Sequence, residues 1–345
     1  MVKRLLLAVA LFCALSVPLL AQHVTELSVV PCLENNYKDA KVSIRARVQN
    51  GVGAFIRFRL EDADGLRAYE SPTRGRMNTN NQQLDIQLKN VKCWTAETPH
   101  RYTLYVTLSD KNGKELDVKS KKIAFRKIEF KENRLLVNGR PVLAKGVNLK
   151  EIDPDDCRTM SPERMMQDIR LMKRLNVNTV SSASLANDSC WKDLCDRYGL
   201  YVVEDANFGS RTLVNSNHTL TPGADALRYA YQSIWTSELD ADTGTVKVKN
   251  DNYFIDLYDV ALEAIVEAEG EKVGTTVFAD LDIRPQSEQT VTIPRLSKYV
   301  QKALAEYPDK KIVVSLNFYQ TWDALDILDL DEPIAREQYV VKPVR

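Results

Sequence analysis

The sequence predicts a multidomain protein in which two β-sandwiches flank a segment of alternating strands and helices. Three patterns predict this order: apolar and polar residues alternate in the first part of the chain, apolar residues recur at helical spacing in the middle, and alternation returns toward the C-terminus. The chain has 345 residues, of which 44% are hydrophobic, a composition typical of a globular protein with two or three domains.

The first 21 residues have the pattern of a secretory signal peptide. Lys3 and Arg4 precede an apolar run, Leu5–Leu20, that is too short to span a bilayer, and the small residue Ala21 follows it. We therefore expect cleavage after Ala21, a periplasmic or secreted location, and no membrane insertion of the mature chain. The alternative is that the apolar run is kept as a membrane anchor.

Residues 22–127 are expected to form an immunoglobulin-like β-sandwich. Apolar and polar residues alternate in Lys41–Val48 and again in Arg101–Leu108, and the turn Asp110–Gly113 follows the second run. The basic stretch Lys119–Lys127 alternates with apolar residues, which we interpret as a solvated strand face.

The cysteines give few constraints. Cys13 lies in the signal peptide, and the other five would enter an oxidising compartment, where Cys32 and Cys93 could form a disulfide within the first sandwich. Cys190 and Cys195 are five residues apart on a predicted helix, which turns them away from each other. No Cys-x-x-Cys spacing indicates a zinc or thiol-redox site.

Residues 128–221 change to a pattern of strands and helices. Asn138-Gly139 marks a hairpin, and Ser161-Pro162 marks the start of a helix that continues to Leu175. A second helix contains Trp191 and ends at Gly199. The predicted strands around these helices are Val142–Val147, Val177–Val180 and Leu200–Val203. This order predicts a parallel sheet with right-handed crossovers.

Residues 222–345 are expected to return to β structure as a second sandwich. Its predicted strands include Gly244–Asn250, Thr290–Ile293 and Lys311–Leu316.

The balance of charges excludes some partners. The chain has 47 basic and 47 acidic residues, so binding to nucleic acid or anionic lipid, which depends on excess Lys and Arg, is not expected. Only His23, His100 and His218 are available as histidines for metal or general-base chemistry.

Six motifs along the chain are typical of one enzyme family. They are Lys92–Pro99 with Tyr102–Leu104, Leu136–Val142 with Lys145–Asn148, Gln167–Lys173, Leu194–Val203, Tyr231–Trp235 and Ala335–Tyr339. Together they resemble glycoside hydrolase family 2, the family of the bacterial β-galactosidases. The resemblance implies two immunoglobulin-like β-sandwiches that flank a truncated (β/α) TIM-barrel fragment of about three units. The second sandwich would then be the one that follows the barrel in β-galactosidases, and a β-galactoside or another glycan would be the implied ligand.

The polar motifs of that family are altered. Where the family has Arg-His-Glu-His after its Gly-Val-Asn, this chain has Leu149–Ile152, and Val180–Ala186 replaces the family's Val-Arg-Thr-Ser-His-Tyr-Pro. Glu204–Arg211 ends in Gly-Ser-Arg where the family has a Glu and a His that help to bind magnesium. Glycine offers no ligand and Arg211 would repel the ion, so we expect no metal and no other cofactor.

The predicted barrel segment is also too short to close. A (β/α)8 barrel takes about 200 to 250 residues, whereas this segment supplies three strands, and the strands that carry the family's acid/base and nucleophile glutamates have no counterpart. The remaining weak catalytic candidates at strand ends are Glu151, Glu204 and Asp205. Side chains of adjacent strand residues point to opposite faces, and strands two places apart lie about 9.5 Å from each other.

A separation of about 9.5 Å between Glu151 and Glu204 or Asp205 is far from the roughly 5 Å between the two carboxyl groups of a retaining glycosidase. It lies at the edge of the range for inverting glycosidases. The candidate sugar contacts are Asn148, Asn187 and Asn207. All four tryptophans, Trp94, Trp191, Trp235 and Trp322, are expected in the core rather than in a sugar-stacking platform.

Three hypotheses follow. The first is a secreted, catalytically inactive β-galactosidase relative that serves as a binding or structural module. The second is a glycosidase whose site is completed by a partner chain, and the third is a deletion product without function. A three-stranded barrel fragment also leaves a parallel strand edge exposed, which the second sandwich, another copy of the chain or another partner could cover.

Overall fold

The computed structural model describes residues 22–71, 75–131, 134–149, 160–182, 188–203, 221–323 and 325–342. The chain divides into two compact units. The first contains residues 1–93 and 100–126, and the second contains residues 94–99 and 127–345. No helix in the described ranges is long and apolar enough to cross a membrane.

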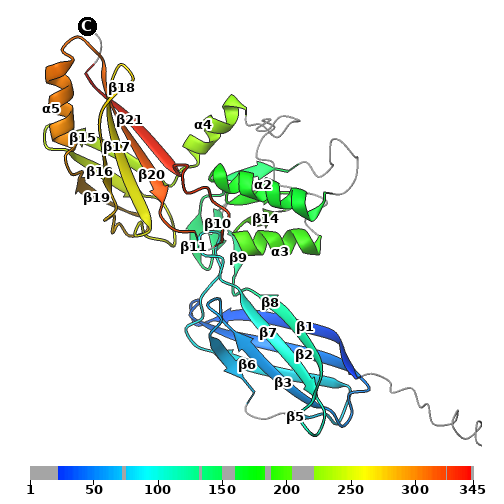
Figure 1. Ribbon diagram of the computed structural model, residues 1–345. Coiled ribbons are helices and arrows are strands. Elements are labelled where there is room, and N and C mark those ends of the chain that lie inside the picture. The colour runs from blue at the N-terminus through cyan, green and yellow to red at the C-terminus, as the bar shows by residue number, and fades with distance from the viewer. Residues whose placement is uncertain are drawn as a thin grey trace, which may run out of the picture. The chain divides into compact units, whose positions relative to one another are not determined.

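The first unit is a sandwich of two antiparallel sheets (Figure 1). One sheet has the order β1-β2-β6, with β1 (His23–Glu34), β2 (Asp39–Gln49) and β6 (Asn81–Leu88). The other has the order β4-β3-β7-β8, with β5 beside β3. Its strands are β3 (Phe55–Glu61), β4 (Arg67–Glu70), β5 (Gly75–Arg76), β7 (Tyr102–Ser109) and β8 (Glu115–Ile123).

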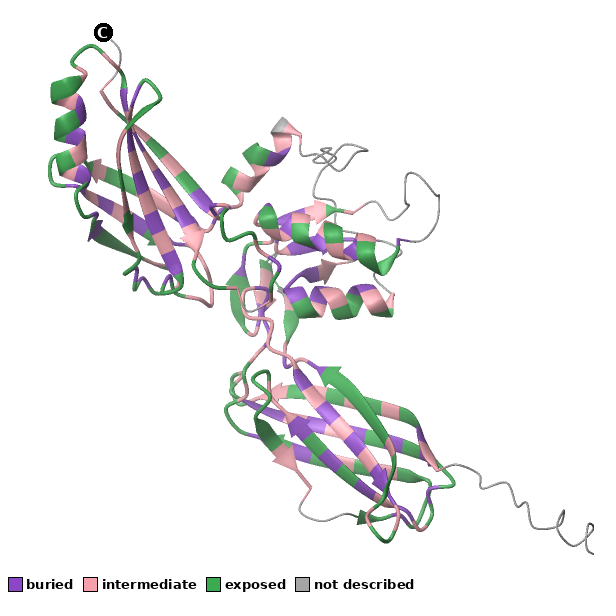
Figure 2. Ribbon diagram, viewed as in Figure 1, coloured by how far each residue is buried: buried purple, intermediate pink, exposed green. Residues whose placement is uncertain are grey.

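Alternation along the strands builds the core of this sandwich. Every second residue of β2 and β7 is buried, as Figure 2 shows, and the two sheets share one apolar cluster that includes Ile44 and Leu104, both without solvent exposure. The basic residues of β8 lie on an exposed face, as the sequence predicted.

The proposed bridge between Cys32 and Cys93 is not formed. Both are free thiols. Cys32 lies on the exposed face of β1, whereas the Cys93 thiol donates to the Tyr37 carbonyl at 3.1 Å, so the two side chains point into different surroundings.

The second unit begins with a hairpin and a parallel sheet. The hairpin strands are β9 (Ile128–Lys131), β10 (Arg134–Val137) and β11 (Arg140–Val142), and positive φ angles at Asn138 and Gly139 form the turn. The parallel sheet has the order β12-β13-β14, with β12 (Gly146–Asn148), β13 (Thr179–Ser181) and β14 (Tyr201–Val203). The described residues contain three parallel strands and no closed barrel.

Two capped helices connect these parallel strands. Helix α2 (Pro162–Arg174) starts as predicted, with the Ser161 hydroxyl accepting from the Arg164 amide at 3.2 Å. Asp188 caps α3 (Ser189–Tyr198) in the same way. Gly199 ends α3 with a φ of 72°, and a Cβ there would lie 2.3 Å from the Ala96 carbonyl oxygen, so only glycine fits.

The second sandwich also has two sheets. One has the order β15-β16-β19, with β15 (Ile234–Asp240), β16 (Thr245–Asn250) and β19 (Ser287–Thr292). The other has the order β18-β17-β20-β21 (Figure 1). Its strands are β17 (Val260–Ala268), β18 (Glu271–Phe278), β20 (Ile312–Gln320) and β21 (Ala335–Lys342).

Two helices were not predicted in this part of the chain. Helix α4 (Pro222–Ala230) replaces the β structure expected from Pro222 onward, because Thr221-Pro222 is a helix start, and its Ala224 belongs to the apolar core around α2 and α3. Helix α5 (Leu296–Glu306) packs Leu296, Val300 and Ala303 into the core of the second sandwich.

The tryptophan prediction holds in part. Trp94 and Trp191 are fully buried and Trp235 is partly buried. Trp322 is 63% exposed, so its assignment to the core was wrong. It follows the last residue of β20 by two positions, beyond the end of the strand whose alternate side chains fill the core.

Candidate functional site

The carboxyl ends of the three parallel strands are where a barrel enzyme would place its catalytic groups. Asn148, Ser181 and Val203 lie in one row across these ends, because Asn148 pairs with Ser181 and Ser181 pairs with Val203. Asn148 is exposed and Ser181 is buried. This row holds no carboxylate.

The other predicted site residues lie outside the described residues. They are Glu151, Glu204, Asp205, Asn187 and Asn207. Asn148 is therefore the one predicted site residue that the structure places. In the described ranges, no group of three or more His, Cys, Asp and Glu side chains could hold a metal ion.

One open edge of the parallel sheet is covered by the second unit's own chain. The Gly146 carbonyl faces away from β13, and the Tyr231 hydroxyl donates to it at 3.0 Å. Next to it, the Lys145 ammonium donates to the Ser233 hydroxyl at 2.5 Å and to the Gln232 carbonyl at 3.5 Å. The segment between α4 and β15 thus lies against the edge of β12 that does not pair with β13.

Burial shifts the pKa values of two side chains in this region, Lys145 and Glu97. Burial lowers the pKa of Lys145 to about 8, although the charges of Glu97 and Asp251 act in the opposite direction. Burial raises the pKa of Glu97, whose carboxylate accepts the backbone amides of Tyr253 at 3.0 Å and Phe254 at 2.7 Å. Perturbed pKa values often mark catalytic groups, but these two side chains are used to join segments of the chain.

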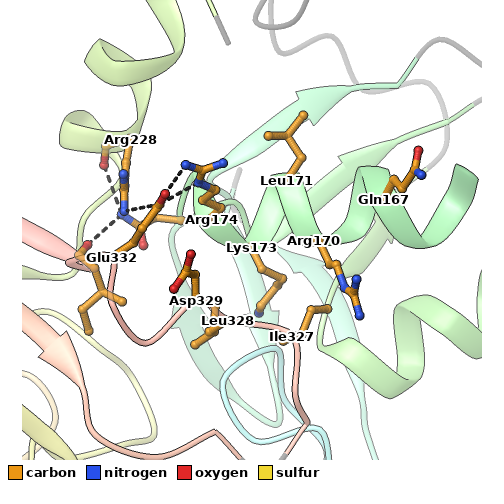
Figure 3. Close-up of a pocket in the computed structure, with 12 residues that line it drawn as sticks. Gln167, Arg170, Leu171, Lys173, Arg174, Arg228, Ile327, Leu328, Asp329 and Glu332 are labelled. Carbon is orange, nitrogen blue, oxygen red and sulfur yellow. Dashed lines mark hydrogen bonds and ion pairs between the residues drawn. The ribbon is translucent and has the colours of Figure 1, made fainter. Parts of the chain in front are cut away.

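A cleft with a volume of about 460 Å³ lies beside α2 (Figure 3). Its walls come from α2, α4 and the loop between β20 and β21. The lining residues are Gln167, Arg170, Leu171, Lys173, Arg174, Asn176, Arg228, Ile327, Leu328, Asp329, Glu332 and Ile334. Gln167, Arg170 and Arg174 recur at helical spacing, so the cleft opens on the outward face of α2 rather than at the strand ends.

A charged network closes one side of this cleft. The Arg174 guanidinium binds the Glu332 carboxylate through two nitrogens, with Nε to Oε2 at 2.6 Å. The Arg228 guanidinium lies 3.3 Å from the same carboxylate and donates to the Pro333 carbonyl at 2.6 Å. Figure 3 draws the contacts of Arg174 and Arg228 with Glu332. They fix the β20–β21 loop against α2 and α4.

Sequence reasoning missed this cleft. Its residues come from three stretches that are up to 167 positions apart, between Gln167 and Ile334, and only folding brings them together. One signal was available, because Arg170 and Arg174 form a cationic stripe on the face of α2 opposite Met165 and Ile169.

The fold and the strand-end geometry define a chain with a sandwich and a partial TIM barrel, and comparison with known proteins places it in a family. Residues 22–126 match glycosyl hydrolases family 2, residues 128–250 match the TIM barrel domain of that family, and residues 246–342 match domain 4 of β-galactosidase. The chain belongs to glycoside hydrolase family 2, as its motifs predicted.

The curated relatives are much longer than this chain. A β-galactosidase of Alteromonas mediterranea is 35% identical over 198 residues, which is 54% of this chain and 19% of that protein. A β-galactosidase of Photobacterium profundum is 31% identical over 233 residues, or 64% of this chain and 22% of that protein. The chain thus spans about a fifth of the length of these relatives.

Among solved structures, a β-glucuronidase of Parabacteroides merdae matches with a TM-score of 0.47 and 21% identity over 53% of this chain and 24% of that one.

Proposed function

We propose that this chain is an exported, catalytically inactive relative of the β-galactosidases that serves as a binding or structural module. One observation carries the proposal. The TIM barrel match begins at residue 128 and the match to the next domain begins at residue 246, which leaves 118 residues for a barrel that takes about 200 or more.

The contacts of the barrel fragment support a structural role. The Tyr231 hydroxyl binds the Gly146 carbonyl at the edge of β12, and Lys145 beside it binds Ser233. The β20–β21 loop is held against α2 by Arg174 and Arg228. These contacts stabilise an incomplete sheet. None of these residues belongs to a pair of carboxylates that could lie on either side of a glycosidic bond. A glycosidase needs such a pair at about 5 Å or at about 6.5 to 9.5 Å.

Turnover of a nitrophenyl β-galactoside by the purified protein tests the inactivity. We expect no hydrolysis above that of buffer, and no difference between the chain and its Glu151→Gln variant. Hydrolysis that the Glu151→Gln substitution abolishes would contradict the proposal, because the Glu151 carboxylate would then act on the glycosidic bond.

The export part of the proposal rests on the first 21 residues. We expect the protein isolated from the periplasm or the medium to begin at Gln22, which mass spectrometry of the N-terminal peptide measures. A protein found only inside the cell with Met1–Ala21 intact would overturn this part and leave the statement about inactivity untouched.

A second candidate function is a glycosidase completed by a partner chain. The observation that favours it is β14, which pairs with β13 on one side and with no other strand in the described part of the chain. A homo-oligomer or another protein could supply strands there. Light scattering during size-exclusion chromatography, with activity measured in each fraction, tests this candidate. Activity confined to an assembly would support it, and an inert monomer would contradict it.

A further inference from the structure

The cleft beside α2 has an excess of positive charge. Arg170, Lys173, Arg174 and Arg228 line it, against two acidic side chains, Asp329 and Glu332. Apolar side chains, among them Leu171, Ile327 and Leu328, complete the walls. A concave site of this size with apolar walls and a few convergent charges is typical of a small-molecule site, and the sign of the charge favours an anion.

Glu332 indicates which kind of anion the cleft fits. Its carboxylate is bound by the Arg174 guanidinium in the two-point geometry that arginine uses for carboxylates, and Arg228 lies 3.3 Å from the same group. The Glu332 side chain is 24% exposed, so this carboxylate is partly open to solvent and to competition by another carboxylate.

Arg170 adds a second cation, which has no ion-pair partner among the described residues. It precedes Arg174 by four residues, so both side chains start from the same face of α2, although their guanidinium groups point in different directions in Figure 3. Arg170 is exposed, and within the described part of the chain it forms no hydrogen bond or ion pair. Lys173 is already engaged, because its ammonium donates to the carbonyls of Ala96 and Gly199.

We propose that this cleft binds a small organic carboxylate of about monosaccharide size, held by Arg170 and Arg174 and covered by Ile327 and Leu328. Glu332 competes for Arg174 and thereby weakens binding. The inference concerns binding alone, so it goes beyond the proposed function and stands whether or not the chain hydrolyses a glycoside.

Calorimetric titration of the full chain with three probes tests the ligand class. Galacturonate and galactose form a matched pair that differs in a carboxylate, and inorganic phosphate is a second anion. We expect galacturonate to bind one site at least tenfold more tightly than galactose or phosphate do. Equal affinity for galacturonate and galactose would overturn the proposal, and so would phosphate binding as tightly as galacturonate.

Two variants test whether Arg170 takes part in binding. Arg170→Gln should weaken galacturonate binding at least fivefold without changing the melting temperature, because this side chain is exposed and forms no hydrogen bond or ion pair with another described residue. Arg284→Gln, which removes an exposed arginine that does not line the cleft, is the control and should leave the affinity unchanged. If the Arg170→Gln variant bound galacturonate with unchanged affinity, Arg170 would not hold the ligand and the proposal would be wrong.

The Glu332→Gln variant tests whether Glu332 competes with the ligand for Arg174 or has only a structural role. Removing the charge should tighten galacturonate binding at least threefold, since Arg174 is no longer neutralised. A folded variant in which the affinity falls or stays the same would contradict the competition. If this variant does not fold, the Arg170→Gln result still decides the proposal.

Discussion

The first sandwich and the barrel fragment differ in where their cores come from. The core of the sandwich is built from residues of its own unit, between Val24 and Phe125. The core around α2 and α3 combines Ile169 and Trp191 with Ala224 of α4 and Ile327 of the β20–β21 loop. The sandwich has two complete sheets. The three-stranded parallel sheet does not close into a barrel, and residues of α4 and of the β20–β21 loop complete its core.

The largest effect is expected when that cover is removed. A chain that ends at Ala230 loses Tyr231, which binds the Gly146 carbonyl, together with Ile327 and Glu332. We expect amides in α2 and α3 to lose their protection against hydrogen exchange, because the core and the sheet edge become solvated. Amides in β2 and β7 should keep theirs. Unchanged protection of α2 would show that the barrel fragment is independent of the second sandwich.

Matched core substitutions in the two units sharpen the comparison. Ile44 and Ile169 are both fully buried, and each change to alanine should lower the free energy of unfolding of its own unit by about 2–5 kcal/mol. Trp94, Trp191, Trp235 and Trp322 all belong to the second unit, so tryptophan fluorescence reports on that unit.

In urea, Ile169→Ala should therefore shift the fluorescence transition, and Ile44→Ala should leave it in place. A shift of equal size in both variants would mean that the two units unfold together, which would break the comparison.

A smaller effect is expected at the loop that covers α2. Ile327 is 8% exposed and packs in the core of the barrel fragment, so Ile327→Ala should cost about 2 kcal/mol in the same fluorescence transition. Val340→Ala, at a position that is 52% exposed, is the control and should change stability by less than about 0.5 kcal/mol. Similar values for the two variants would remove the loop from the core.

The smallest effect is a dependence of stability on pH that is specific to the second unit. The pKa values of Lys145 and Lys173 are lowered to about 8 by burial, against 10.5 for an exposed lysine. Between these values the unfolded chain binds more protons than the folded chain, so stability should rise from about pH 8 to about pH 10. Lys145→Met should reduce this rise. A fluorescence transition whose urea midpoint does not move over this range would contradict it.

Local patterns in the sequence predicted much of the fold. The alternation in Lys41–Val48 and Arg101–Leu108 became β2 and β7, and Ser161 became the cap of α2. Helices α4 and α5 were missed although signals existed, namely Thr221-Pro222 as a helix start and apolar residues at helical spacing from Leu296. Short helices beside strong strand patterns are easily overlooked.

Tertiary features could not be read from the sequence. The pairing of Arg174 with Glu332 joins residues 158 positions apart, and Trp322 became exposed because the strand before it ends two residues earlier. Of the candidate sugar contacts, the structure describes Asn148 at the end of β12. The cleft beside α2 was not predicted, because its charges converge only once the β20–β21 loop folds over α2.

Native-state hydrogen exchange of the full chain in low concentrations of denaturant tests the central claim most directly, namely that the barrel fragment is stable only as part of the second unit. The account predicts that the slowest amides of α2 open with the same free energy and denaturant dependence as those of β17 and β20, and differently from those of β2 and β7. If α2 instead opened with a free energy and denaturant dependence of its own, while β17 and β20 stayed protected, the barrel fragment would be a separate folding unit and the claim would be wrong.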